Sequence, residues 1–282
     1  MPIEYDVSRE ALMHPERQPT VFTAGQKPDL RLLAVEGARL AYIRADSDDE
    51  EAQRLAQSLA LVGFERPAFH VDEESGAYCY CTLRKSDGLA MVSFRGSQPD
   101  NPSEVITDLN FLPSPAGVGR VHSGFKQASD ALRPHVTQWL EGAASGRKRL
   151  LLCGHSLGAA LATMFAGLVA PHAVITMGSP RVGDVDFIRS LPSQVVTRIV
   201  NCCDVVPTLP PGFTSYRHVG TLLYIDKDGK LHEVPESRFM LQDKISGQAD
   251  HVWRLIAHRD FDGLPVRMLS DHAPINYVRA FA

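Results

Sequence analysis

Ser156 stands between two glycines in the run Gly154-His155-Ser156-Leu157-Gly158. The apolar stretch 149–153 leads into this run, and small and apolar residues at helical spacing follow it as far as Gly167. A G-x-S-x-G pattern at a turn from strand to helix lifts a serine hydroxyl clear of a sheet, where it can act as a nucleophile. In such a strained turn the glycines remove Cβ atoms that would collide with the strand or the helix. The pattern therefore predicts acyl transfer through a covalent intermediate on Ser156.

A nucleophilic serine needs a general base, and the base needs an acid that orients it. In the fold that carries this turn, both follow the serine in the chain. Asp204 comes directly after the apolar stretch 195–201 and has apolar neighbours, as expected for a buried, ionised partner of an imidazole. Asp184 and Asp186 follow the preceding strand. The residues thus favour Asp204 as the acid and leave Asp184 and Asp186 as alternatives.

Six of the eleven histidines follow Ser156. His272 lies in a loop just before a short terminal helix that begins at Pro274, which suits a base carried on a short arm. His218, beside Arg217, could equally be a hydrogen-bonding residue at the edge of a strand. Position alone does not decide between a catalytic and a structural role for His272.

An oxyanion hole requires two hydrogen-bond donors near the nucleophile. The first is the backbone N–H of Leu157, because this residue follows the serine at the start of a helix. The second is expected from Phe94-Arg95-Gly96-Ser97, where a strand ends in Gly-Ser at the same edge of the sheet. The N–H of Ser97, or its hydroxyl, could serve, although the same residues also fit an ordinary turn from strand to loop.

Strands and helices alternate through the middle of the chain, which predicts an α/β fold with a mainly parallel, twisted central sheet and helices on both faces. The predicted helices are 30–61 with a charged interruption at 46–51, 124–140 with a kink at Pro134, 249–258, and a short one from Pro274. The predicted strands are 77–83, 89–95, 149–153, 173–177, 195–201, 219–225 and 231–234. Asp-Gly turn signals indicate that the first two and the last two of these strands form hairpins.

The chain contains neither an internal repeat nor a long linker, which indicates one large domain, 30–282, after an N-terminal extension, 1–29. Segment 96–119 is rich in Gly and Pro and is interrupted by a short amphipathic piece, 103–111. We expect this segment to form a movable flap over the site.

Composition excludes several function classes. A net charge of −4 gives no general attraction to nucleic acid or to anionic membranes, so that contact with lipid would need a local apolar patch. No stretch has the length of a membrane span, and the charged first twenty residues lack the apolar core of a signal peptide. The five cysteines lack metal-site spacing and look like core residues in a reducing compartment. We therefore expect a cytoplasmic location, with leaderless export remaining open, and neither a metal site nor a cofactor.

Six motifs occur in the order found in the fungal-type class 3 lipases of the α/β-hydrolase superfamily, which the chain resembles from about Leu30 to its C-terminus. They are Phe94-Arg95-Gly96-Ser97, Val121-His122-Ser123-Gly124-Phe125, Gly154-His155-Ser156-Leu157-Gly158, Gly178-Ser179-Pro180-Arg181-Val182-Gly183, Asn201-x-x-Asp204-x-Val206-Pro207 and Asp271-His272-x-x-Ile275-x-Tyr277. The resemblance implies a triad, an oxyanion hole and a lid. These are Ser156, Asp204 and His272 for the triad, Ser97 and Leu157 for the hole, and 98–108 for the lid. Secreted fungal members carry disulfides, for which the cysteines here are not arranged.

The resemblance implies a serine carboxylic-ester hydrolase, a lipase or esterase, that cleaves acylglycerols or related lipid esters. Phospholipase A1 or acyltransferase activity with the same triad, and a catalytically inactive lipid-binding module, are the alternatives. The predicted lid is polar, with Asp100, Asn101 and Glu104 beside Val105 and Ile106. We therefore expect weak activation at an oil–water interface, transient contact with lipid, and activity on short, soluble esters.

Overall fold

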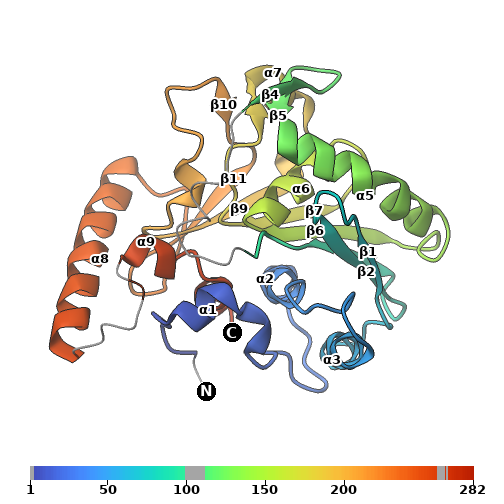
Figure 1. The fold of residues 1–282 in the computed structure, drawn as a ribbon, viewed down its shortest axis with the longest axis horizontal. Helices are drawn as coiled ribbons and strands as arrows, with labels where there is room; N and C mark the ends of the chain where they lie inside the picture. The colour runs from blue at the N-terminus through green and yellow to red at the C-terminus, as the bar shows by residue number, and fades with distance from the viewer. Residues whose placement is uncertain (1–2, 99–111, 259–263, 265) are drawn as a thin grey trace.

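The computed structural model describes residues 3–98, 112–258, 264 and 266–282 (Figure 1). The predicted amphipathic piece 103–111 lies outside the described residues. The predicted lid 98–108 does too, apart from Gln98.

Within this part of the chain, a central sheet of eight strands has the order β1-β2-β3-β6-β7-β9-β11-β12. The strands are β1 (Ala68–Val71), β2 (Tyr78–Arg84), β3 (Leu89–Phe94), β6 (Arg149–His155), β7 (Ala173–Met177), β9 (Val196–Asn201), β11 (Thr221–Ile225) and β12 (Leu231–Glu233). The five strands from β3 to β11 pair in parallel, whereas β1, β2 and β12 pair antiparallel at the two margins. The hairpins β2–β3 and β11–β12 were both predicted from their turn residues.

Helices cover both faces of this sheet, which confirms the predicted α/β-hydrolase fold class (Figure 1). On one face α6 (Leu157–Ala166) packs over β6, and α5 (Ser123–Glu141) packs beside α6 and over β1 and β2; on the other face α2 (Leu30–Leu40) and α10 (Pro274–Val278) pack together. Successive side chains of a strand point to opposite faces. Leu150 and Leu152 of β6 accordingly join the core under α5 and α6, while Leu151 and Cys153 join the core on the α2 side. A strand that is apolar on both faces belongs in the middle of a parallel sheet.

The predicted helix 30–61 is two helices, α2 and α3 (Asp49–Ala60). Asp48 caps α3, because its Oδ1 accepts a hydrogen bond from the backbone N of Glu51 at 2.8 Å. The charged interruption is therefore a loop followed by a helix start. The other helical elements are α1 (Arg9–Met13), α7 (Val185–Ser190), α8 (Ser237–His258), α9 (Arg267–Ser270), and the short 3₁₀ turns Pro15–Arg17, Ser193–Val195 and Val206–Thr208.

Two features of the described residues differ from the sequence prediction. Helix α8 begins at Ser237, twelve residues before the predicted start at Ala249, whereas α5 is one helix that contains Pro134 and matches its predicted bounds to within one residue at each end. A second, small sheet joins β4 (Pro113–Pro115), β5 (Arg120–His122), β8 (Gly183–Asp184) and β10 (Tyr216–Arg217) in the order β10-β8-β5-β4. Its strands have two or three residues each, too few for a periodic pattern to reveal them.

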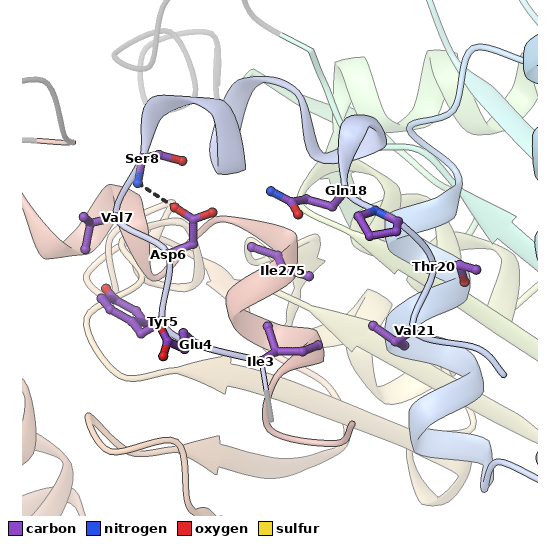
Figure 2. Close-up of a pocket in the computed structure, with 11 residues that line it drawn as sticks. Ile3, Glu4, Tyr5, Asp6, Val7, Ser8, Gln18, Thr20, Val21 and Ile275 are labelled. Carbon is purple, nitrogen blue, oxygen red and sulfur yellow. Dashed lines mark hydrogen bonds between the residues drawn. The ribbon is translucent and has the colours of Figure 1, made fainter. Parts of the chain in front are cut away.

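The N-terminal residues pack on the domain. Asp6 exchanges two hydrogen bonds with the side chain of Asn276 in α10, at 2.9 and 2.7 Å. Ala11, Leu12 and Phe22 are buried in the core on the α2 side. Figure 2 shows the pocket of about 650 Å³ that this segment forms with Ile275. None of the eleven residues that line it is a histidine, cysteine or lysine.

No helix in the described ranges is both long enough and apolar enough to cross a membrane.

Candidate active site

Ser156 occupies the turn between β6 and α6, where the sequence placed it. Its backbone has φ 56° and ψ −123°, a strained conformation for a residue other than glycine. The backbone N of Ser156 donates to the carbonyl O of Met177 in β7 at 3.0 Å, which fixes the turn on the sheet. A Cβ on Gly154 would collide with the backbone of Gly158, and a Cβ on Gly158 would collide with the backbone of Phe94. Both glycines are therefore needed for this close packing.

The structure brings Ser156, His272 and Asp204 together. Nε2 of His272 lies 3.0 Å from Oγ of Ser156, and Nδ1 of His272 lies 2.9 Å from Oδ2 of Asp204. Asp204 follows β9, and His272 lies between α9 and α10, so that three separate loops at the carboxyl edge of the sheet meet at this point. The side chains predicted to act as nucleophile, base and acid are thus within hydrogen-bonding distance in the order that a catalytic triad requires.

Asp204 is completely buried and accepts two further hydrogen bonds. The backbone N of Val206 donates to Oδ1 at 2.9 Å, and the hydroxyl of Tyr277 in α10 donates to Oδ2 at 2.5 Å. Burial, together with the charge of Asp204, raises the pKa of the Tyr277 hydroxyl, which therefore remains a donor. These bonds compensate the carboxylate for its loss of water. The sequence contained a signal for Tyr277, since this residue ends the last of the six motifs.

The alternative acids and base have other partners. Asp184 caps α7, accepting from the backbone N of Phe187 and from that of Arg120, each at 3.0 Å. Asp186 lies exposed in the first turn of the same helix. Burial lowers the pKa of His218 to about 3, and its Nε2 donates to the carbonyl O of Pro207 at 2.8 Å. Asp184 and His218 thus have structural roles in this fold, and none of the hydrogen bonds described here joins these three residues to the Ser156–His272 pair.

Ser97 and Leu157 both line the cavity that contains Ser156. Leu157 is the first residue of α6, where backbone N–H groups have no partner within the helix. Gly96 brings the end of β3 beside the nucleophile, because a Cβ on this glycine would stand 3.2 Å from Cβ of Ser156. Both predicted oxyanion donors therefore come from segments that pass next to Ser156.

The cavity has a volume of about 250 Å³ and a mixed polar and apolar lining. Its wall includes Leu12 of α1, which belongs to the segment predicted to be an extension of the domain. The lining residues are Leu12, Tyr42, Glu74, Ser75, Ser97, His122, Gly124, Phe125, Gln127, Ala128, His155, Ser156, Leu157, Pro180, Val206 and His272.

His155, a variable position of the G-x-S-x-G pattern, joins the nucleophile turn to the loop of the base. Burial, reinforced by the nearby His272, lowers the pKa of His155 well below its usual range, so the ring is neutral. Nε2 must then donate to the carbonyl O of His272 at 2.8 Å, while Nδ1 accepts from the hydroxyl of Tyr42 at 2.8 Å. Sequence reasoning missed both His155 and Tyr42, because neither contact is local in the chain.

Asp271 anchors the same loop from the other side. Its carboxylate accepts hydrogen bonds from the hydroxyl of Tyr5 at 2.8 Å, from the backbone N of Cys203 at 2.9 Å and from Nε of Arg267 at 3.0 Å. Cys203 immediately precedes Asp204, and Asp271 immediately precedes His272. These contacts therefore fix the acid and the base relative to each other.

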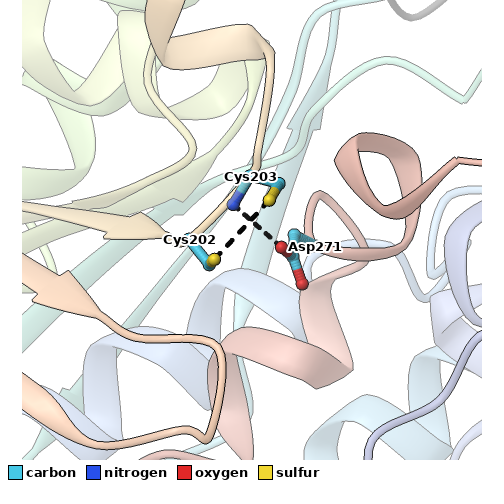
Figure 3. A group of neighbouring side chains, drawn as sticks. All are labelled: Cys202, Cys203 and Asp271. Atoms are coloured by element: carbon cyan, nitrogen blue, oxygen red, sulfur yellow. Dashed lines mark hydrogen bonds between the residues drawn. The ribbon is translucent and has the colours of Figure 1, made fainter. Parts of the chain in front are cut away.

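The group Cys202, Cys203 and Asp271 offers three metal-ligand atoms within 4.8 Å of one another (Figure 3). Arg267 and two other donors already occupy the carboxylate, and the arginine charge would oppose a cation there. The two sulfur atoms lie 3.6 Å apart, and all five cysteines of the chain are free thiols. We interpret these three residues as structural: the hydrogen bond from Cys203 to Asp271 holds together the loops that carry Asp204 and His272.

The family described as Lipase (class 3) matches residues 91–214 of the chain. Triacylglycerol lipase OBL1 of Arabidopsis thaliana is 24% identical over 285 residues, which cover 72% of this chain and 54% of that protein. Secreted mono- and diacylglycerol lipase 1 of Fusarium solani is 31% identical over 168 residues, which cover 55% and 50% respectively. The chain thus spans about half the length of these relatives. The crystal structure of the lipase from Rhizopus microsporus var. chinensis aligns with a TM-score of 0.59 and 21% identity, covering 79% of this chain and 83% of that one.

Proposed function

We propose that this chain, which belongs to the class 3 lipase family, is a serine hydrolase that cleaves carboxylic esters of lipids such as acylglycerols. The observation that carries the proposal is the hydrogen-bonded series from Ser156 through His272 to Asp204 at one wall of an open cavity. The two relatives named above are lipases of tri-, di- and monoacylglycerols, which supports the substrate class.

In the first half of the reaction, Oγ of Ser156 attacks the ester carbonyl carbon while Nε2 of His272 takes its proton. The proton then passes from Nε2 to the departing alcohol, which leaves the acyl group on Ser156. Asp204 holds the imidazole so that Nδ1 carries a proton, and it stabilises the imidazolium that forms. In the second half His272 activates a water molecule in the same way, and the acid is released.

The oxyanion of each tetrahedral intermediate accepts hydrogen bonds from the backbone N–H of Leu157 and from Ser97. The start of α6 adds a partial positive charge at this place. Support for Leu157 comes from its position at N1 of the helix, and support for Ser97 comes from Gly96, which places the end of β3 against the nucleophile.

The apolar wall residues Leu12, Phe125, Ala128 and Val206 are suited to the acyl chain of an ester. Five free thiols support a reducing compartment, and we propose a cytoplasmic location on that ground.

Hydrolysis of a series of nitrophenyl esters from acetate to palmitate tests the proposal, with Ser156→Ala as the control. We expect turnover by the wild-type chain only, and the acyl length with the highest rate distinguishes an esterase from a long-chain lipase. A fluorescent phosphonate that reacts with activated serines gives the second readout. A folded protein that neither turns over esters nor takes the label would refute the proposal and favour a lipid-binding module.

A further inference from the structure

Helix α8 turns its polar side toward the rest of the protein. Asp243, Gly247 and His251 lie four residues apart on this inner side, and the last two are buried. Asp243 accepts from the Tyr224 hydroxyl at 2.8 Å, and Nε2 of His251 donates to the carbonyl O of Leu264 at 3.0 Å. Hydrogen bonds of polar side chains therefore join α8 to the body of the protein.

The opposite side of the helix is apolar and faces solvent. Leu241 is 60% exposed, Ile245 65% and Trp253 70%, and Val252 is exposed as well. Positions 241, 245 and 252 follow one another at four and seven residues, so they form one stripe along the helix, with Trp253 beside it. We call these four residues the outer face of α8. A helix on the surface of a soluble domain normally has the reverse arrangement, with its apolar stripe on the core. A contiguous exposed apolar face of this kind marks a binding surface.

The charges around the outer face favour an anionic partner. The two carboxylates of α8 lie away from it, because Asp243 is bonded inward and Asp250 forms an ion pair with Nζ of Lys227 at 2.9 Å. One exposed cation, Arg238, lies beside the outer face near the start of the helix, whereas the guanidinium of Arg254 lies over the ring of Tyr5, 5.6 Å from its centroid. Trp with Leu, Ile and Arg is the composition with which interfacial helices bind lipid headgroups and the upper part of the acyl chains.

The outer face also has the right location for a lipid hydrolase. Sγ of Cys202 lies 3.1 Å from Oδ2 of Asp243, and Sγ of Cys203 lies 3.3 Å from the carbonyl O of Lys244. Because the next residue is Asp204, α8 stands at the carboxyl edge of the sheet, the edge that carries the triad (Figure 1).

A second copy of the chain is the weaker choice of occupant. The 22 residues of α8 make a helix about 33 Å long and about 10 Å wide, so that the outer face can bury on the order of 330 Å². A stable specific interface needs roughly 800 Å² from each partner. A lipid surface accepts the helix without such complementarity.

We propose that the outer face of α8 docks onto a phospholipid surface with anionic headgroups and so holds the catalytic edge of the sheet against its substrate. This inference rests on the proposed function, because docking serves an enzyme whose substrates are lipids.

Trp253 is a built-in probe for this docking. The chain has two tryptophans, and Trp139→Phe removes the other one, which lies partly buried in α5. The experiment uses the full chain with Trp139→Phe and Ser156→Ala, so that the lipids are not hydrolysed. We expect the emission of Trp253 to shift to shorter wavelength on addition of phosphatidylcholine vesicles that contain phosphatidylglycerol, and the protein to float with those vesicles.

The test variant is Leu241→Ser with Ile245→Ser, both at exposed positions where folding is not at risk. Loss of two large apolar contacts should weaken vesicle binding by at least about tenfold. The matched control is Leu168→Ser, an exposed leucine just after α6, at the opposite edge of the sheet. Circular dichroism checks the fold of each variant.

Three results would overturn the proposal. The first is a chain with Trp139→Phe and Ser156→Ala whose Trp253 emission does not respond to vesicles. The second is a double variant that binds vesicles as tightly as the control. The third is a wild-type dimer, seen in light scattering, that the double variant does not form. Hydrolysis of a short, soluble nitrophenyl ester by chains with intact Ser156 separates the two proposals. If this ester is not hydrolysed, the proposed function is contradicted. Vesicle binding is measured with the inactive Ser156→Ala chain, so that it tests the docking of α8 independently of hydrolysis. The double variant should hydrolyse this soluble ester at the wild-type rate.

Discussion

Tyr277→Phe removes a single hydroxyl from the most buried part of the site. That hydroxyl donates to Oδ2 of Asp204 at 2.5 Å and accepts from the backbone N of Asn201 at 3.2 Å. The phenyl ring keeps its volume and its place in the core, so that packing is unchanged. The change alters the positioning of the carboxylate that orients His272, and it removes an acceptor from the backbone N–H of Asn201.

The size of the effect follows from the partners that remain. A hydrogen bond to a charged group contributes about 1.5–3 kcal/mol. Since 1.36 kcal/mol is a factor of ten in rate, its complete loss from the transition state would lower kcat by about 10- to 150-fold. Val206 and His272 still bind the carboxylate in the variant. We therefore expect the lower end, a fall of kcat by about tenfold with KM unchanged.

Tyr224→Phe is the matched control. This tyrosine is equally buried, and its hydroxyl donates at 2.8 Å to another carboxylate, that of Asp243, which is not part of the triad. Both variants should lose about 1–3 kcal/mol of unfolding free energy in urea, and only Tyr277→Phe should lose turnover of a soluble nitrophenyl ester. The same small change of kcat in both variants, within about twofold, would refute a positioning role for Tyr277.

Three further predictions concern the acid, the neutral histidine and the cavity wall. Asp204→Asn should lower kcat by a factor on the order of 10⁴, whereas Asp184→Asn, which keeps the cap of α7, should leave it unchanged; the reverse order in steady-state kinetics would move the acid to Asp184. The depressed pKa of His155 means that the unfolded chain binds a proton that the folded chain does not, so stability should fall as pH drops below about 6.5. Urea unfolding should show that His155→Gln flattens this dependence by up to about 1.4 kcal/mol per pH unit, and an unaltered slope would contradict the burial argument. Leu12→Ala should widen the cavity and move the preferred nitrophenyl ester toward longer acyl chains, and an unmoved optimum would show that Leu12 does not contact the acyl group.

Short sequence patterns predicted the elements whose conformation depends mainly on neighbouring residues. The turn around Ser156 could be identified because two glycines and a helix start at fixed positions leave few other conformations. Asp204 could be favoured because a carboxylate directly after an apolar strand must lie at the carboxyl edge of a parallel sheet. The hairpin turns were visible from their Asp-Gly pairs.

The contacts that complete the site are not local, which is why the sequence did not reveal them. Tyr42 is 113 positions from His155 in the chain, and Tyr5 is 266 positions from Asp271. Neither hydrophobic periodicity nor the spacing of residues within a motif predicts contacts between residues so far apart in the chain. The start of α8 was predicted too late because Leu241 and Ile245 face outward and Gly247 follows them, so that the first half of the helix lacked the pattern of a helix packed on a core.

The hydrogen bond between Tyr5 and Asp271 also bears on how the protein acquires activity during folding. The nucleophile turn is built from neighbouring residues and can form early, whereas the base is held by a contact between the two ends of the described chain. Contacts of such high sequence separation form slowly, because the entropy of closing a long loop must be overcome first. Catalytic competence should therefore be the last property to appear on refolding, after the sheet and its helices have already assembled.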